Sequence, residues 1–311
     1  MNALYGIRVA DFYNLCLQVF EEIRFPIRFS NFSKKMYGNF VHTFLLVYRE
    51  KLNVSYRRFV QIADENNLQR MLCIKKMPHY TTLQKFMQRI DKKVFEKMVK
   101  ACCKLIKLKD VEASIDGTGF SNTNPSHHYI KRINGVNVKN YTKTVFLTDN
   151  KSKLILNIKT HSDNTHETKN FIPLIKELKK TLKTILADKA YDSIKNREYC
   201  YKNNMEVHIP FRQYTQSRKQ ITGKPSKRKT HQKLFNKQKY KNRALIESIN
   251  SAIKRTLGSY VNSKKAINQQ KQVTLKALAY NIEHITRTIK LLFYINIKGF
   301  LQRKINQKLF I

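Results

Sequence analysis

The chain has 311 residues, of which 41% are hydrophobic, and this is enough for about two domains with real hydrophobic cores. Its 61 lysine and arginine residues against 21 aspartate and glutamate residues give a net charge of +40. So large a charge predicts a polyanionic partner, most commonly nucleic acid, and no basic amphipathic helix favours a membrane surface instead.

The sequence was searched for a signal peptide, a transmembrane segment and patterns of paired cysteines. The first residues lack the apolar h-region of a signal peptide, and no stretch of about 18 uncharged apolar residues predicts a transmembrane helix. Five cysteines are present without a Cys-x-x-Cys pair, so we expect reduced thiols and neither a disulfide framework nor a zinc site.

Residues 1–108 are expected to form a helical N-terminal domain. Apolar residues recur at three-and-four spacing over several stretches, which is typical of helices that pack on a core. The predicted helices cover about 10–23, 33–51, 54–66 and 92–107.

A short helix is predicted after Pro78. Thr81 and Gln84 fit a capping box at its start, and the helix would expose Lys85 and Arg89. Small helices with scattered cations fit a helix-turn-helix reader of DNA, in which Lys85 and Arg89 would contact the DNA, and they fit a plain helical bundle equally well.

Residues 109–293 are expected to form an α/β domain with a mixed sheet, because β-rich stretches first follow one another and then alternate with helices. The predicted strands cover 111–115, 144–147, 154–160, 184–187 and 207–210. The predicted helices cover about 166–182, 193–203, 239–257 and 264–293. The last helix carries apolar residues at core spacing, namely Leu275, Leu278, Ile282, Ile285 and Ile289.

Two basic segments lie within and after this domain. Residues 211–243 hold twelve lysines and arginines and no acidic residue, and the part at 211–238 is expected to be a loop. Like charges this dense repel unless an anion neutralises them, so Lys227, Arg228 and Lys229 are candidate phosphate contacts. Residues 294–311 are expected to form a basic C-terminal tail.

Three carboxylates stand where catalysis would place them. Asp116 and Asp188 each follow a predicted buried strand, and Glu247 lies on a predicted helix. Converging carboxylates repel one another, and divalent cations remove that cost. Mg²⁺ prefers carboxylate oxygens, and two such ions can serve a phosphoryl displacement by activating the attacking oxygen and stabilising the leaving one.

The helix that carries Glu247 adds further candidates. At about 100° per residue, Tyr240, Arg243, Glu247 and Lys254 share one face. Arg243 could grip a phosphate in a bidentate manner, Lys254 could act as a point charge, and Tyr240 could stack on a base. On spacing alone, an ordinary Arg–Glu pair on the helix surface is the more common explanation.

Three sequence segments resemble the DDE insertion-sequence transposases of bacteria and archaea. IDGTGF around Asp116 is similar to the segment of the first aspartate, and ILADKAYDS around Asp188 is similar to that of the second. YKNRALIESINSAIK, at 240–254, matches the Tyr-x2-Arg-x3-Glu-x6-Lys signature at every signature position. The helical region upstream also resembles these enzymes, so the resemblance covers roughly residues 40 to 290.

This resemblance implies a ribonuclease H-like mixed sheet flanked by helices, with Asp116, Asp188 and Glu247 as catalytic residues and ligands of two Mg²⁺ ions, for which Mn²⁺ can substitute. It implies cleavage at terminal inverted repeats and strand transfer into target DNA, with Tyr240, Arg243 and Lys254 positioning the DNA end. A homodimer in the synaptic complex and a cytoplasmic, nucleoid-associated location follow from the same resemblance, as does the absence of a membrane partner.

The histidines and the remaining aspartates are less informative. The family often shows His-Asp before the helix between its aspartates, whereas this chain has His166-Glu167, with His161 just before. We expect a structural or hydrogen-bonding role for His166 and an ordinary surface role for the loop residues His127 and His128. Asp192 is expected to cap a helix, and Asp149 is expected to shape a turn.

Three alternatives remain open from the sequence. A DNA-binding protein without catalysis, such as a repressor or a decayed transposase, shares the charge and the helices but does not need all three carboxylates. A nuclease of the same fold would use the same metals without joining strands. An RNA-binding protein would explain the charge but not the carboxylates.

Overall fold

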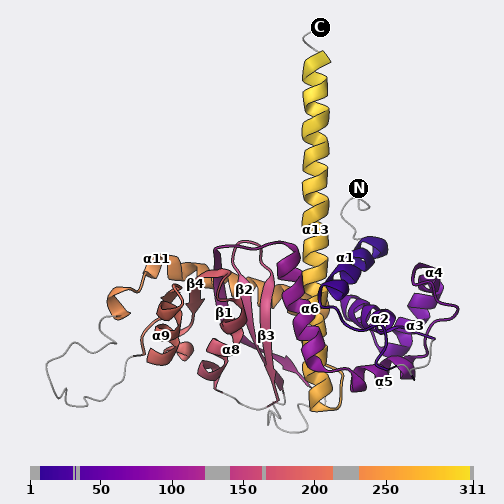
Figure 1. The fold of residues 1–311 in the computed structure, drawn as a ribbon, viewed down its shortest axis with the longest axis horizontal. Helices are drawn as coiled ribbons and strands as arrows, with labels where there is room; N and C mark the ends of the chain where they lie inside the picture. The colour runs from indigo at the N-terminus through magenta and orange to yellow at the C-terminus, as the bar shows by residue number, and fades with distance from the viewer. Residues whose placement is uncertain are drawn as a thin grey trace, which may run out of the picture.

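The computed structural model describes residues 8–30, 32, 36–122, 141–162, 166–212 and 231–308, with side chains described as far as residue 290. Its centre is a mixed five-stranded sheet, with helices on both faces and a helical N-terminal region (Figure 1). This is the α/β fold class that the sequence predicted. None of the helices in these ranges is both long enough and apolar enough to span a membrane.

The N-terminal region is helical, as expected. Its helices are α1 (Val9–Glu22), α2 (Asn39–Leu52), α3 (Tyr56–Glu65), α4 (Leu68–Met71), α5 (Tyr80–Arg89) and α6 (Lys92–Leu105). Side chains cap two of them, because Ser55 accepts from the Arg58 amide at 3.3 Å and Asp91 accepts from the Lys93 amide at 2.8 Å. The expected capping box is wrong, since His79 precedes α5 and Thr81 already lies in its first turn.

The sheet has the strand order β3-β2-β1-β4-β5. Its strands are β1 (Val111–Ser121), β2 (Tyr141–Asp149), β3 (Ile155–His161), β4 (Leu182–Ala187) and β5 (Glu206–His208). β2 pairs antiparallel with β1 and β3, whereas β4 pairs parallel with β1 and β5. β1 does not end before Asp116 as predicted, because its backbone pairing with β2 continues through Gly117 and Gly119 to Ser121.

Short helical segments connect the later strands. They are η1 (Glu167–Asn170), α8 (Phe171–Ile175), η2 (Lys176–Leu178), η3 (Lys189–Tyr191) and α9 (Ile194–Lys202). The single helix predicted over 166–182 is therefore wrong. Pro173 has no amide hydrogen and its ring would clash with the Lys169 carbonyl, so an α-helix can begin only near Phe171.

The C-terminal part comprises α11 (Lys237–Tyr240), η4 (Lys241–Arg243), α12 (Ala244–Leu257) and α13 (Ala266–Lys308). The helix predicted over 239–257 is thus interrupted by a 3-10 turn. α13 extends beyond the predicted end at 293, and Figure 1 shows it projecting far from the body of the molecule. Leu275, Leu278, Ile282 and Ile285 are buried as expected, but Ile289 is exposed.

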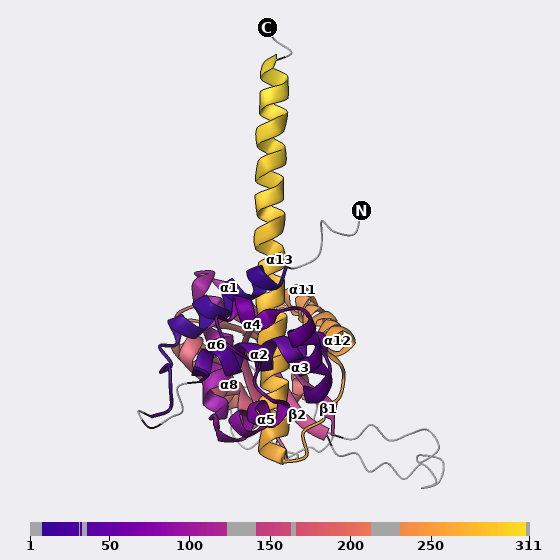
Figure 2. The same cartoon turned by 90° about the vertical axis from the view of Figure 1, so that its right-hand side faces the viewer.

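Two hydrophobic cores lie on opposite faces of the sheet. One contains Ile115 and Ala187 and is covered by α8 and α9. The other contains Phe120 and Phe146 and is shared by α12, α13 and the N-terminal helices. α13 packs against α2 and α6 as well as against β3, so it lies between the N-terminal helices and the sheet (Figures 1 and 2).

Candidate active site

Strand register brings the first two candidate carboxylates together. Ile115 of β1 and Ala187 of β4 are direct partners in the parallel pair. Asp116 is the next residue of β1, and Asp188 is the first residue after β4, so the two stand at the same level. The Asp188 carboxylate also accepts from the Ala190 amide at 2.7 Å, which caps η3. Side chains alternate between the two faces of a strand, which turns Asp116 away from the core of Ile115 and toward α12.

Asp116 is largely buried and has defined partners. Asn250 of α12 donates from Nδ2 to Asp116 Oδ2 at 3.0 Å, and Arg243 Nη1 lies 3.6 Å from Asp116 Oδ1. Burial, with smaller contributions from Asp188 and Glu167, raises the pKa of Asp116 to about 6, and Arg243 opposes this rise. Burial is therefore the main reason that Asp116 tends to hold its proton, and the positive charge of Arg243 is the main influence that opposes it.

Glu247 reaches this group through Arg243. Arg243 Nη2 donates to Glu247 Oε1 at 2.6 Å, so the guanidinium joins Glu247 to Asp116. The Glu247 side chain is 58% exposed. The ordinary i,i+4 pair that the spacing suggested is therefore present, and its arginine also faces the first aspartate.

The other two signature residues flank Arg243 and Asp116. Tyr240 ends α11, with its ring centre 5.9 Å from the Arg243 guanidinium carbon. Lys254 Nζ lies 5.8 Å from the centre of the Phe120 ring, and burial lowers the pKa of Lys254 while Asp116 opposes that change. The 3-10 turn separates Tyr240 from α12, so the four residues do not share one regular helix as the periodicity predicted.

Glu167 is a fourth carboxylate that the sequence did not indicate as a site residue. A Cβ atom on Gly117 would lie 2.9 Å from Glu167 Oε1, so the missing side chain at Gly117 allows Glu167 to approach β1. Lys143 of β2 pairs with the same oxygen at 3.1 Å. The only available signal was its position beside His166, in the place where the resembled family carries His-Asp.

Two further polar residues lie at the site because of tertiary packing, which the sequence does not reveal. The Tyr191 hydroxyl and Asn250 Oδ1 are buried, and neither has a hydrogen-bond partner among the described residues. Burial raises the pKa of the Tyr191 hydroxyl well above its ordinary value, and Glu167, Asp116 and Asp188 add to that effect. The hydroxyl therefore stays protonated as a hydrogen-bond donor near the carboxylates.

The structure assigns local roles to several other candidates. His161 Nε2 lies 2.7 Å from Asn170 Oδ1, and His166 occupies the residue before η1. Asp149 shapes a turn by accepting from the Lys151 and Ser152 amides, as expected.

Asp192 does not cap a helix as expected. Its carboxylate binds buried Arg197 at 3.0 Å and accepts from the Arg212 amide at 2.9 Å. Ser193, not Asp192, is the residue before α9. His127, His128, Lys227, Arg228 and Lys229 lie outside the described residues.

Comparison with known proteins bears on this arrangement. A family model described as "Transposase DDE domain" matches residues 107–282, which is more than half of the chain. The chain belongs to this transposase family. No curated protein matches the sequence of this transposase-family chain.

Among solved structures, the chain is similar to a cryo-EM structure titled as a piggyBac transposase synaptic complex with hairpin DNA. It shares 11% sequence identity, with a TM-score of 0.44, and the match covers 97% of this chain and 80% of that one.

The donor set of this transposase-family site suits a hard divalent cation. Asp116, Asp188, Glu167 and Glu247 supply carboxylate oxygens, and Asn250 adds a buried oxygen without a partner. No three of the described His, Cys, Asp and Glu side chains are grouped closely enough to hold a metal as they stand. Arg243 occupies the place between Asp116 and Glu247 instead.

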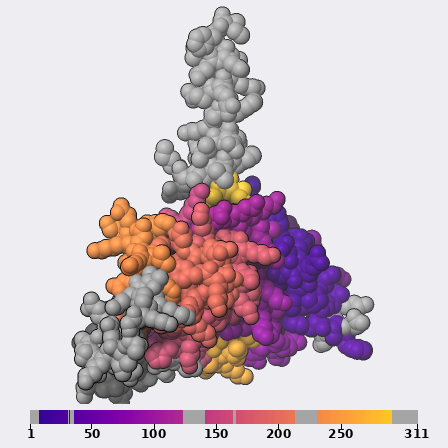
Figure 3. All heavy atoms as spheres, turned by 60° about the vertical axis from the view of Figure 1, so that its left-hand side comes forward, coloured from indigo at the N-terminus to yellow at the C-terminus, as the bar shows by residue number. Residues whose placement is uncertain are grey.

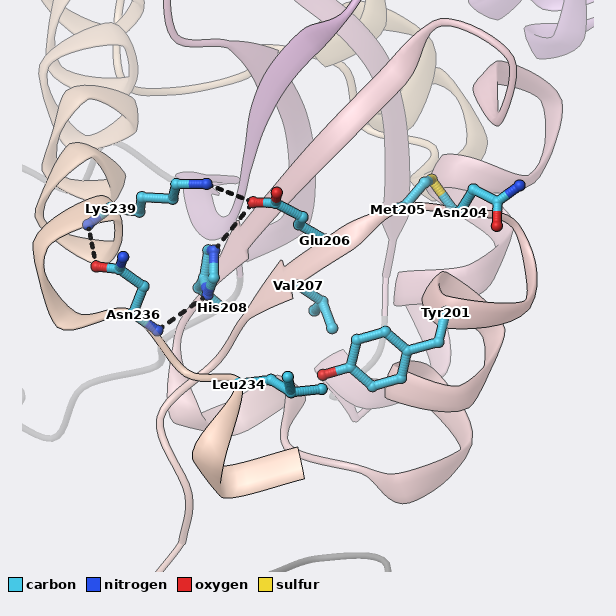
Figure 4. A pocket seen from close by; sticks show the side chains of 9 residues that line it. All are labelled: Tyr201, Asn204, Met205, Glu206, Val207, His208, Leu234, Asn236 and Lys239. Carbon is cyan, nitrogen blue, oxygen red and sulfur yellow. Dashed lines mark hydrogen bonds and ion pairs between the residues drawn. The ribbon is translucent and has the colours of Figure 1, made fainter. Parts of the chain in front are cut away.

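The segment that carries Tyr240 and Arg243 is anchored beside β5. There, a hollow of about 480 Å³ is bordered by Tyr201, Leu234 and Lys239 (Figure 4). Lys239 Nζ binds Glu206 Oε2 at 2.6 Å, and the Asn236 amide donates to His208 Nδ1 at 3.2 Å (Figure 4). In Figure 3 the orange segment that includes α11 lies beside the pink and salmon surface of the sheet region. These contacts hold α11 in place ahead of Arg243.

The N-terminal candidates Lys85 and Arg89 lie on the exposed side of α5. Arg89 also rests over the Phe29 ring at 5.9 Å. Both cations are therefore accessible to an anionic partner.

Proposed function

We propose that the chain is an insertion-sequence transposase that cleaves DNA at terminal inverted repeats and joins the freed end to target DNA. The observation that carries this proposal is that Asp116 on β1 and Asp188 just after β4 stand at one level, with the Arg243–Glu247 pair facing Asp116. Membership of the transposase family and the net charge of +40 support DNA as the substrate.

In this proposal, Asp116, Asp188 and Glu247 hold two divalent cations, Mg²⁺ or Mn²⁺. Such ions would supply an activated attacking oxygen and a stabilised leaving oxygen in phosphoryl transfer. The raised pKa of Asp116 is consistent with a bound cation in this proposal, because a cation would stabilise the charged carboxylate against the burial that disfavours it.

The chain's own residues would bind and orient the DNA end. Arg243 would exchange Glu247 for a phosphate, which its planar guanidinium can grip with two hydrogen bonds. Lys254 would add a positive charge, and Tyr240 would stack on a base. Asn250 would keep Asp116 oriented through its 3.0 Å hydrogen bond.

The wider assembly belongs to the same proposal. Cleavage at paired repeats requires that two DNA ends be held together, which a homodimer would do. Lys85, Arg89, Lys227, Arg228 and Lys229 would bind DNA outside the cleavage site, and the nucleoid would be the place of action.

The test compares DNA binding with DNA cleavage by the full chain, using the DNA that flanks its gene, where inverted repeats and a duplicated target are expected. Glu247→Gln should keep DNA binding and lose Mg²⁺-dependent nicking at the repeat ends. Glu177→Gln is the matched control, because Glu177 is also exposed, at 63%, and also pairs with a cation, Lys100. The control should cleave like the wild type.

The alternatives predict different outcomes. Cleavage that survives Glu247→Gln would show that the assignment of the metal ligands is wrong. Binding without cleavage by the wild type, under every metal condition, would indicate a repressor or a decayed transposase. Cleavage without joining to target DNA would indicate a nuclease of the same fold.

A further inference from the structure

A second hollow, of about 900 Å³, lies away from the carboxylates. It is bordered by the end of α2, by α3 and α5, and by the linker 258–265 between α12 and α13. Figure 2 shows α3 and α5 in front of the lower, orange part of α13 where this linker enters. The hollow therefore lies between the N-terminal helices and the C-terminal part of the family domain.

The lining of this hollow is cationic. Arg49, Arg57, Lys264 and Lys265 line it, and no acidic side chain does so within the described ranges. Arg49 is neutralised by its ion pair with Glu50, whereas the side chains of Arg57, Lys264 and Lys265 are exposed. Most of the other lining residues carry hydroxyl or amide groups. Such a lining is suited to an anion that accepts several hydrogen bonds.

Three helices begin at this hollow. The first residues of α3 and α5 line it, as do the two lysines that immediately precede α13. The amino-terminal ends of helices carry partial positive charge and free amide hydrogens, and both favour a phosphate. Convergence of three such ends adds to the charge of the side chains.

A buried donor independently points to a ligand. The Arg49 side chain is 3% exposed and lines the hollow, and its Nε has no hydrogen-bond partner among the described residues. Buried polar atoms are normally satisfied, so unpaired ones at a cavity indicate that something else binds there.

The linker beside the hollow is held in a fixed shape. Gln272 Oε1 accepts from the Asn262 amide at 3.1 Å and from the Ser263 amide at 3.2 Å. Gln269 Nε2 donates to the Ser263 carbonyl at 2.9 Å. Lys264 and Lys265 therefore project from a backbone that is already ordered, which lowers the entropy cost of binding.

The hollow is connected to the carboxylate site by α12 and β1. The Ser121 amide donates to the Ser259 carbonyl at 3.0 Å, so the linker adjoins the end of the strand that carries Asp116. Glu247 lies ten residues before the end of α12, a span of about 15 Å at 1.5 Å per residue. Phosphates on one DNA strand are about 3.4 Å apart along the axis, so a duplex that ran along α12 would pass roughly four phosphates over this length.

We propose that this hollow binds a backbone phosphate of the DNA duplex, at a distance from the site of cleavage. The proposal rests on the proposed function, which supplies DNA as the ligand. Lys264, Lys265 and Arg57 contact the phosphate, and the helix ends and Arg49 Nε complete the site. The hollow thereby fixes the direction in which the duplex leaves the carboxylates.

The test is the salt dependence of duplex DNA affinity for the full chain. Lys264→Ala/Lys265→Ala should make the log–log slope less steep by about 0.9, the value for one lost phosphate contact. Lys179→Ala/Lys180→Ala is the matched control. This exposed pair precedes β4, at the end of the sheet opposite to Asp116, and its removal should leave the slope unchanged.

The outcomes separate this proposal from the proposed function. If the wild type binds DNA and both double variants change the slope equally, the hollow is not a DNA site. The same result is expected if the hollow binds only free phosphate. If the wild type does not bind DNA, the proposed function fails first. Lys179→Ala/Lys180→Ala should also retain Mg²⁺-dependent cleavage, which Glu247→Gln should lose.

Discussion

The surroundings of Asp116 determine the pKa of its carboxylate and the partners that it contacts. Its carboxylate is held by Asn250 and faced by Arg243, yet burial and two further carboxylates raise its pKa to about 6. Strand register explains the proximity of Asp188, and the absence of a side chain at Gly117 explains that of Glu167. Each of these causes lies outside the immediate sequence of Asp116.

The identity of the site residues was partly predictable from the sequence. Asp116, Asp188 and Arg243 could be found because they belong to motifs with specific spacing. Glu167 could not be found, because its approach to β1 depends on how a distant segment packs. Asn250 was similarly hidden, since an asparagine on a helix gives no signal until its partner is known.

Lys276 provides a prediction about a buried charge. Its side chain is 1% exposed, and burial, with Arg49 nearby, lowers its pKa to about 8. Glu50 Oε2 lies 3.6 Å from Lys276 Nζ, and Glu50 also forms an ion pair with Arg49. Above pH 8 the folded chain loses this proton, whereas the unfolded chain keeps it up to about pH 10.5, so this group makes the folded state more stable as pH rises.

Urea unfolding checks this expectation. The free energy of unfolding of the wild type relative to Lys276→Met should rise between pH 8 and 10.5, by roughly 3 kcal/mol at 1.36 kcal/mol per pKa unit. If the free energies of unfolding of the wild type and Lys276→Met instead change in parallel with pH over this range, the lowered pKa of Lys276 is contradicted.

At the scale of elements, the linker after α12 depends on one glycine. Gly258 has φ +84°, and a Cβ there would lie 2.9 Å from the Asn53 amide group. Gly258→Ala should lower the free energy of unfolding by roughly 1–3 kcal/mol, because it imposes both backbone strain and this contact.

Denaturant unfolding measures the effect of Gly258→Ala, and Gly38→Ala is its control. Gly38 has φ −77°, and its added Cβ would meet its nearest atom at 3.5 Å, an ordinary contact. We expect the control to change stability by less than about 0.5 kcal/mol. If Gly258→Ala and Gly38→Ala lower the free energy of unfolding equally, a side chain at position 258 does not strain the linker backbone.

The elements were more predictable where the local pattern agrees with the packing. α1 and α6 lie close to their predicted ranges because their apolar spacing matches their buried faces. The segment 166–182 differs, since Pro173 prevents one continuous helix. β1 is longer than predicted because pairing with β2 outweighs the low strand preference of its two glycines.

At the scale of the whole molecule, the sheet separates two cores, and one of them joins the N-terminal helices to α12 and α13. The sequence predicted the α/β sheet and the helical N-terminal region, but not this shared core, because contacts between segments so far apart leave no local pattern. The shared core places the basic hollow beside the strand that carries Asp116. DNA held at both places would contact the N-terminal helices and the family domain together.

Divalent cation binding to the full chain in complex with duplex DNA tests the central claim most directly. Electron paramagnetic resonance measures the affinity of the complex for Mn²⁺, after correction for the ions that bind DNA alone. This affinity should be at least roughly tenfold lower in Asp188→Asn than in the wild type. Asp110→Asn, an exposed aspartate just before β1, should bind Mn²⁺ like the wild type. Equal binding by the wild type and Asp188→Asn would contradict a cation site built on these carboxylates.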